Sequence, residues 1–273
     1  MSSLPYAPLL ADGALQFAFE KATTEGKITI GTLVIVSLFS WTVIFTKSWQ
    51  LWRARREGKR FFESYRGTRD PLELARKNED YDGAPAYELY VAGADELDYH
   101  LKNNAVEIKG TKRVSSASFD SVKIALERTA SQQALSLEKG MIVLSTAVAG
   151  GPFIGLLGTV WGVMETFSGI AKANSASLTA MAPGVAGALI ATVVGLFVAI
   201  PAMFAYNFMV TSIRAITQEL DNFATEFATA IEHNYVDNRP LSEEISQANN
   251  ALADRIVESN TALGDRLVDA LKR

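Results

Sequence analysis

Three long uncharged stretches dominate the pattern of hydrophobic and polar positions along the chain. The first covers about Ile28 to Thr46, the second covers Met141 to Met164, and the third lies within Ala173 to Ser212. A helix of about 20 residues crosses the hydrocarbon core of a bilayer. A buried helix of a soluble protein can imitate one such run. Three runs in one chain predict an all-α protein with three transmembrane helices.

Polar segments flank the three apolar runs and divide the chain further. The N-terminal segment contains a mildly amphipathic stretch at 8–22, which is either an interfacial helix or a flexible terminus. No signal peptide is visible in it. The expected boundaries are 1–27 for this outer segment, 28–46 for the first span, 47–139 for a helical aqueous domain, 140–165 for the second span, 166–182 for a short outer loop, 183–210 for the third span and 211–273 for a helical tail.

Charges beside the first span predict its orientation. Six basic residues lie between Lys47 and Arg60, and Glu57 is the only acidic residue among them. The positive-inside rule therefore places residues 47–139 in the cytoplasm and the N-terminus outside. With three spans, the C-terminus is also cytoplasmic, and Arg214 marks the inner end of the third span.

Helical patterns fill most of the aqueous domain. The first span is expected to continue as a helix to about Tyr65, and Asp70 has the position of an N-cap. A turn is expected at 81–85, followed by a helix at 86–101. A further helix at 119–139 is expected to lead straight into the second span.

A weak repeat marks the tail. ADRIVE at 253–258 recurs as GDRLVD at 264–269, eleven residues later, which suits nearly straight packed helices. The tail is thus either an oligomerisation helix or an amphipathic helix that folds back on its own subunit. Its apolar stripe includes Leu252, Ile256, Leu263 and Leu267.

Composition excludes several classes of function. The net charge of −4 argues against a nucleic-acid binder, and the absence of cysteine rules out disulfides and thiolate metal sites. His100 and His233 lack metal-ligand spacing, so no metal site is expected. No nucleophile–base pair or phosphate-binding loop is visible, so neither an enzyme nor a cofactor is expected.

Small residues recur at helical spacing in the second and third spans. Such residues let transmembrane helices approach closely, here within a subunit, between subunits or around a partner helix. Pro201 should kink the third span. The packing positions are Gly151, Gly155, Gly158 and Gly162 in the second span, with Gly184, Ala188 and Gly195 in the third.

Few polar side chains lie within the spans. Thr159 and Thr192 carry hydroxyls that could line a water chain, and Glu165 is the only acidic residue expected to touch a span, at its outer end. A proton relay needs a titratable group at depth. If this protein conducts protons, a partner chain is therefore expected to supply a carboxyl group.

The two later spans resemble a known family. GLLGTVWGVMETFSGIA at 155–171 and APGVAGALIATVVGLFVAIPAMFAYN at 182–207 resemble the second and third spans of the ExbB/TolQ/MotA proton-channel family, most closely ExbB and TolQ. The resemblance implies an inner-membrane homopentamer around a pore. Two single-span ExbD- or TolR-like partners would occupy that pore, with a TonB- or TolA-like protein beyond them.

The same resemblance implies a function and a site. The subunit would use proton flow past the partner's membrane Asp to deliver energy to the periplasm or outer membrane, for a TonB, Tol or gliding client. Thr159 and Thr192 match the threonines that face this Asp. Many ExbB and TolQ proteins carry Glu where this chain has Gly187. Either the partner Asp and the two threonines suffice, which we favour, or Glu165 contributes, or the protein conducts poorly. The alternative function is a non-conducting oligomeric scaffold derived from the same family.

Overall fold

A computed structural model describes residues 24–77, 79–108, 111–173 and 178–237, together with 246, 249–250 and 252–261. The interfacial stretch at 8–22 and the tail residues Leu263 and Leu267 lie outside this part of the chain. The elements are α2 (Thr24–Arg66), α3 (Glu73–Lys77), α4 (Pro85–Asn103), β1 (Val106–Ile108), β2 (Thr111–Arg113), α5 (Ser116–Glu138), α6 (Met141–Ala173) and α7 (Leu178–Tyr235).

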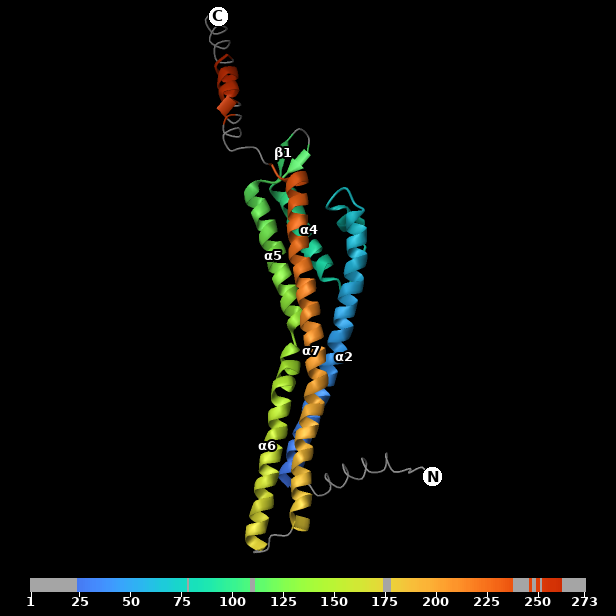
Figure 1. Ribbon diagram of the computed structural model, residues 1–273. Helices are drawn as coiled ribbons and strands as arrows, with labels where there is room; N and C mark the ends of the chain where they lie inside the picture. Colours follow the sequence, from blue (N-terminus) through green and yellow to red (C-terminus); the bar gives the residue numbers. More distant parts are fainter. Residues whose placement is uncertain are drawn as a thin grey trace, which may run out of the picture.

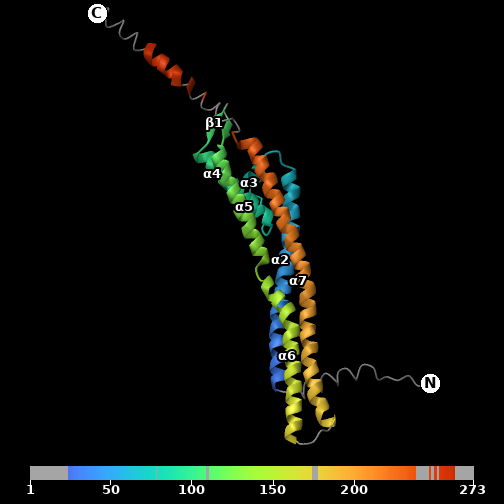
Figure 2. The same cartoon turned by 60° about the vertical axis from the view of Figure 1, so that its left-hand side comes forward.

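The long helices form an elongated bundle. Helix α7 runs the whole length, α5 and α6 follow one another along one side of it, and α2 lies on another side (Figures 1 and 2). Helices α2 and α7 point in the same direction, whereas α6 is antiparallel to both. Among the described residues, these three helices are long and apolar enough to cross a membrane.

The core of the aqueous domain is aromatic. Phe61 and Tyr65 of α2 meet Phe223 of α7 at ring-centroid distances of 5.4 and 5.1 Å, and Tyr90 of α4 meets Phe227 of α7 at 5.0 Å. All five side chains are buried. Aromatic pairs of this kind contribute about 0.5–1.5 kcal/mol beyond their burial. This cluster fixes the aqueous ends of α2 and α7 against α4.

A two-stranded hairpin interrupts the helical pattern at the far end of the aqueous domain. Strands β1 and β2 pair antiparallel, with Val106 opposite Arg113. The hairpin leads into Val114, whose backbone N–H donates to Tyr235 at 2.8 Å and whose carbonyl accepts from Asp237 at 3.0 Å. The hairpin region therefore holds the end of α7. The sequence pattern did not predict these strands.

The helix at 119–139 does not lead straight into the second span, which corrects the sequence-based expectation. Gly140 has a φ of +90°, a conformation that favours glycine, and it separates α5 from α6. The buried Lys47 ammonium donates to the carbonyls of Ser136 and Leu137 at 3.2 and 3.0 Å. A cation from α2 thus caps the C-terminal end of α5.

Candidate functional site

Helices α6 and α7 pack so closely that several of their glycines have no room for a side chain. A Cβ atom added at Gly195 would lie 2.6 Å from the carbonyl oxygen of Gly151, and one at Gly155 would lie 2.9 Å from that of Ala191. At Gly162, the added atom would lie 2.8 Å from the Cβ of Ala188. Of the three packing arrangements considered from the sequence, the structure shows the one within a subunit.

Further small residues lie in the contact between α6 and α7. A Cβ at Gly158 would meet both Ala191 of α7 and Thr29 of α2, at 2.7 and 3.0 Å, so three helices converge at that level. Gly184 faces the Thr166 side chain. Pro201 lies inside α7, which continues through it as one helix. The kink at Pro201 stays a prediction.

Thr159 and Thr192 meet within this contact. Their hydroxyl oxygens lie within hydrogen-bonding distance of each other. The Thr192 hydroxyl also reaches the Gly155 carbonyl at 3.1 Å, and the Thr159 hydroxyl reaches the carbonyls of Gly155 and Ala188 at 3.2 and 3.3 Å. The side chains come from antiparallel helices and are half-buried. The structure therefore joins two polar groups that lie 33 residues apart into one hydrogen-bonded pair.

The remaining candidate positions lie elsewhere. Glu165 is exposed in the C-terminal part of α6. Gly187 is buried on α7, on the same helical stripe as Ala191, which packs with Ile190 against Ile30 of α2. Gly187 therefore belongs to the face of α7 that meets α2. The structure does not bring Glu165 and Gly187 into the threonine pair.

One acidic residue was missed by the sequence reasoning. Helix α2 begins at Thr24, and Glu25 lies in its first turn. The Glu25 Oε2 atom is buried and has no hydrogen-bond partner among the described residues. The segment boundary at 27 had assigned Glu25 to an outer segment. The burial of this oxygen atom becomes visible only in the folded structure.

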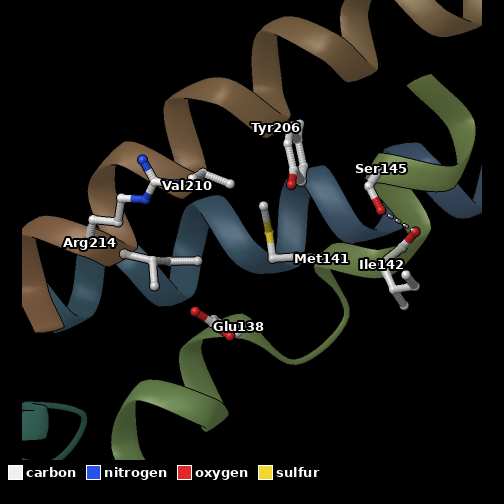
Figure 3. A pocket seen from close by; sticks show the side chains of 8 residues that line it. Glu138, Met141, Ile142, Ser145, Tyr206, Val210 and Arg214 are labelled. Atoms are coloured by element: carbon white, nitrogen blue, oxygen red, sulfur yellow. Dashed lines mark hydrogen bonds between the residues drawn. The ribbon is translucent and has the colours of Figure 1, made fainter. Parts of the chain in front are cut away.

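A pocket of about 370 Å³ opens where α5, α6 and α7 meet (Figure 3). Arg214 of α7 lies at one end of the pocket and Ser145 of α6 at the other, with Met141 between them. Glu138 from the end of α5 also lines it. Glu138, which precedes the second span, and Arg214, which follows the third, therefore lie at the same level along the helix bundle.

A polar contact joins α3 to the end of α7 in the aqueous domain. Asp70 accepts hydrogen bonds from the Leu72 backbone at 3.0 Å, from the Tyr235 hydroxyl at 2.7 Å and from Arg76 at 2.8 Å. Desolvation acts to raise the pKa of Asp70, but these donors and the Arg76 charge together hold it below its usual value. Desolvation and the bond to Asp70 raise the pKa of Tyr235 to about 12.

The described part of the tail adds an apolar surface. Residues 252–261 are helical, and both Leu252 and Ile256 are exposed. No group of three or more His, Cys, Asp or Glu side chains among the described residues could hold a metal ion. The role of the tail in oligomerisation stays a prediction.

Comparisons with a family model and with individual proteins point to the same family. Residues 95–222 match the MotA/TolQ/ExbB proton channel family. The Tol-Pal system protein TolQ of Haemophilus influenzae is 35% identical over 219 residues, which cover 78% of this chain and 91% of that protein. TolQ of Pseudomonas aeruginosa is 34% identical over 199 residues, which cover 72% and 83%. The biopolymer transport protein ExbB of Pseudomonas putida is 31% identical over 208 residues, which cover 76% and 60%.

Proposed function

Because this chain belongs to the MotA/TolQ/ExbB proton channel family, we propose that it is a proton-motive-force-driven motor subunit that serves a Tol- or TonB-type system. In this proposal, the chain assembles as a pentamer around two single-span partners of the ExbD or TolR kind. A membrane Asp of the partner carries the proton. The assembly passes energy to the periplasm or outer membrane, through a TonB- or TolA-like protein.

The Thr159–Thr192 pair is the observation that carries this proposal. Both hydroxyls lie inside the spans, and each reaches a backbone carbonyl of the opposite helix. Hydroxyls can both donate and accept hydrogen bonds, so they can support a water chain beside a titratable group. Within the described part of the chain, this pair of hydroxyls forms a side-chain hydrogen bond between the two spans that carry the family motifs.

The packing also supports a central role for α6 and α7. Their small residues are used within the subunit, so their large apolar side chains point outward, including Phe153 and Trp161 on α6 and Phe197 and Phe204 on α7. This surface is too wide for one soluble chain to leave uncovered. Lipid, neighbouring subunits and partner helices would cover it in the proposed assembly.

The charges support the proposed orientation in the inner membrane. Lys47, Lys139 and Arg214 lie at the ends of the spans that join the aqueous domain. The exposed Trp49 and Trp52 follow directly after Lys47. Basic residues and tryptophans at one end suit a cytoplasmic interface. In this orientation, the short α6–α7 connection is periplasmic and the C-terminal tail is cytoplasmic.

Native mass spectrometry tests the assembly, with the complex purified in mild detergent from its own membranes. We expect five copies of this chain with a small co-purified single-span chain. Reconstitution of that complex should then give proton flux across vesicle membranes. An oligomer that contains the partner but carries no flux would instead favour the non-conducting scaffold, the alternative that Gly187 raises.

A further inference from the structure

Glu25 lies in a layer of the bundle that can be located from neighbouring contacts. Thr29 of α2 meets the position of Gly158, which in turn faces Ala191. One helical turn further out, the corresponding residues are Glu25 on α2, Gly162 on α6 and Gly187 on α7, because α2 and α7 are parallel and α6 is antiparallel. These three residues therefore belong to the same layer.

Helices α6 and α7 contribute only small residues and no charged side chain to this layer. Gly162 and Gly187 carry no side chain, and Ala188 contributes only a methyl group. No charged residue occurs on α7 between Leu178 and Ile213 or on α6 between Met141 and Met164. Glu165, the nearest charged residue of α6, is exposed, and so is Lys27 of α2.

One carboxylate oxygen of Glu25 is shielded from water, although the side chain as a whole is only half-buried. Its Oε2 atom is buried without a hydrogen-bond partner among the described residues. A carboxylate oxygen that is buried without a hydrogen bond is costly, and protonation lowers that cost. Glu25 lies in the first turn of α2, at the end of the first span, and ionisable groups of transmembrane helices commonly mark ion pathways.

We propose that Glu25 is the proton-carrying carboxyl group of this subunit, in the layer where Gly187 leaves α7 without a side chain. The inference rests on the proposed function. Gly187 precedes Thr192 by five residues, or about 7.5 Å along α7, so Glu25 lies on the outer side of the threonine pair. Its carboxylate binds one proton from the outer water and releases the same proton inward.

Proton flux into vesicles that contain the full complex tests this proposal. Glu25→Gln keeps the size of the side chain but cannot carry a proton, and we expect it to lower flux at least tenfold while the oligomer stays intact. Glu63→Gln, which changes an exposed carboxylate of the same helix, should leave flux unchanged. Normal flux in the Glu25→Gln complex would overturn the proposal.

A relocation variant separates a proton-carrying role from a structural one. Gly187→Glu alone should lower flux, because it forces a second carboxyl group into a filled layer. Glu25→Ala should also lower flux, and the double variant Glu25→Ala/Gly187→Glu should restore at least half of it. Failure of this rescue, with assembly intact, would show that the position of Glu25 matters for packing rather than for its proton.

Chemical labelling gives a second readout that does not depend on flux. A hydrophobic carbodiimide reacts with protonated carboxyl groups in apolar surroundings, so mass spectrometry of the treated complex should find the adduct on Glu25. An unlabelled Glu25 would contradict the proposal. If the wild-type complex carries no flux, the proposed function fails and this inference fails with it. Wild-type flux with a normal Glu25→Gln variant rejects only the inference.

Discussion

The Thr192 hydroxyl lies 3.1 Å from the carbonyl oxygen of Gly155, on the opposite helix. This contact is possible only because Gly155 allows the two backbones to approach. Close packing and polar chemistry therefore depend on each other at this site. A change at Gly155 should affect helix packing, whereas a change at Thr192 should affect the polar contact. The two effects can be measured separately.

Replacement of Thr192 by Val should abolish proton flux without loss of assembly. Valine keeps the branched shape but removes the hydroxyl that meets Thr159 and Gly155. Flux and native mass spectrometry of the same preparation would check this. Thr211→Val is the matched control, because the exposed Thr211 hydroxyl bonds only within its own helix, to Asn207. Normal flux in Thr192→Val would remove Thr192 from the pathway.

Replacement of Gly195 by Ala should destabilise the α6–α7 pair. The added methyl group would lie 2.6 Å from a backbone oxygen, and overpacking of this kind costs about 1–3 kcal/mol. Thermal unfolding in detergent would measure the loss. Gly150→Ala provides the control, since a Cβ there meets nothing within 4 Å and alanine favours a helix. Equal melting temperatures for the two variants would contradict the packing described for α6 and α7.

Replacement of Lys47 by Met should destabilise the junction between α5 and α6 by about 1–3 kcal/mol, because the carbonyls of Ser136 and of the buried Leu137 lose their donor. Lys59→Met, at an exposed position of the same helix, should have little effect.

Lys47 also predicts a pH dependence. Burial, and then the nearby Lys139 charge, lower the pKa of Lys47 from 10.5. Between that lowered pKa and 10.5, the unfolded chain binds the proton and the folded chain does not. The wild type should therefore gain stability over Lys47→Met as pH rises through this window. Unfolding by denaturant at several pH values would detect the difference, and a constant difference would contradict it.

The contact between Asp70 and Tyr235 should stabilise the end of α7 only within a range of pH. The pKa of Asp70 is lowered, so its contribution is present above its usual value of about 3.8 and is lost as pH falls through the folded pKa. The pKa of Tyr235 is raised from 10.0 to about 12, so stability falls as pH rises through that interval. Hydrogen exchange of the last turns of α7 would follow both losses. Tyr235→Phe should reduce the alkaline loss, whereas the exposed Tyr99→Phe should not.

The sequence predicted the long helices well because their signal is local. Uncharged runs identified the three apolar helices, and the family resemblance is confirmed by the comparisons. The helix after the first span ends at Arg66, one residue from the expected position. The Asp70 capping bond is also present, on the Leu72 backbone.

Features that depend on tertiary contacts were not predictable in this way. The break at Gly140 lies beside a cation from α2, which caps α5 from 90 residues away in the sequence. The burial of one Glu25 carboxylate oxygen likewise depends on the folded arrangement and has no local sequence signal. The glycine stripes predicted close packing, but three partners were equally compatible with them until the structure showed α6 and α7 in contact.

Helix α7 continues without interruption from Leu178 to Tyr235. The distance along its axis from Thr192 to Tyr235 is therefore about 65 Å. Over this distance, a tilt of α7 by about 5° at the threonine pair would move its C-terminal end by about 6 Å. The aromatic side chains of Phe223 and Phe227 and the bridge at Val114 would have to follow. A small rearrangement within the bilayer would thus become a displacement large enough for a second protein to sense at the opposite end.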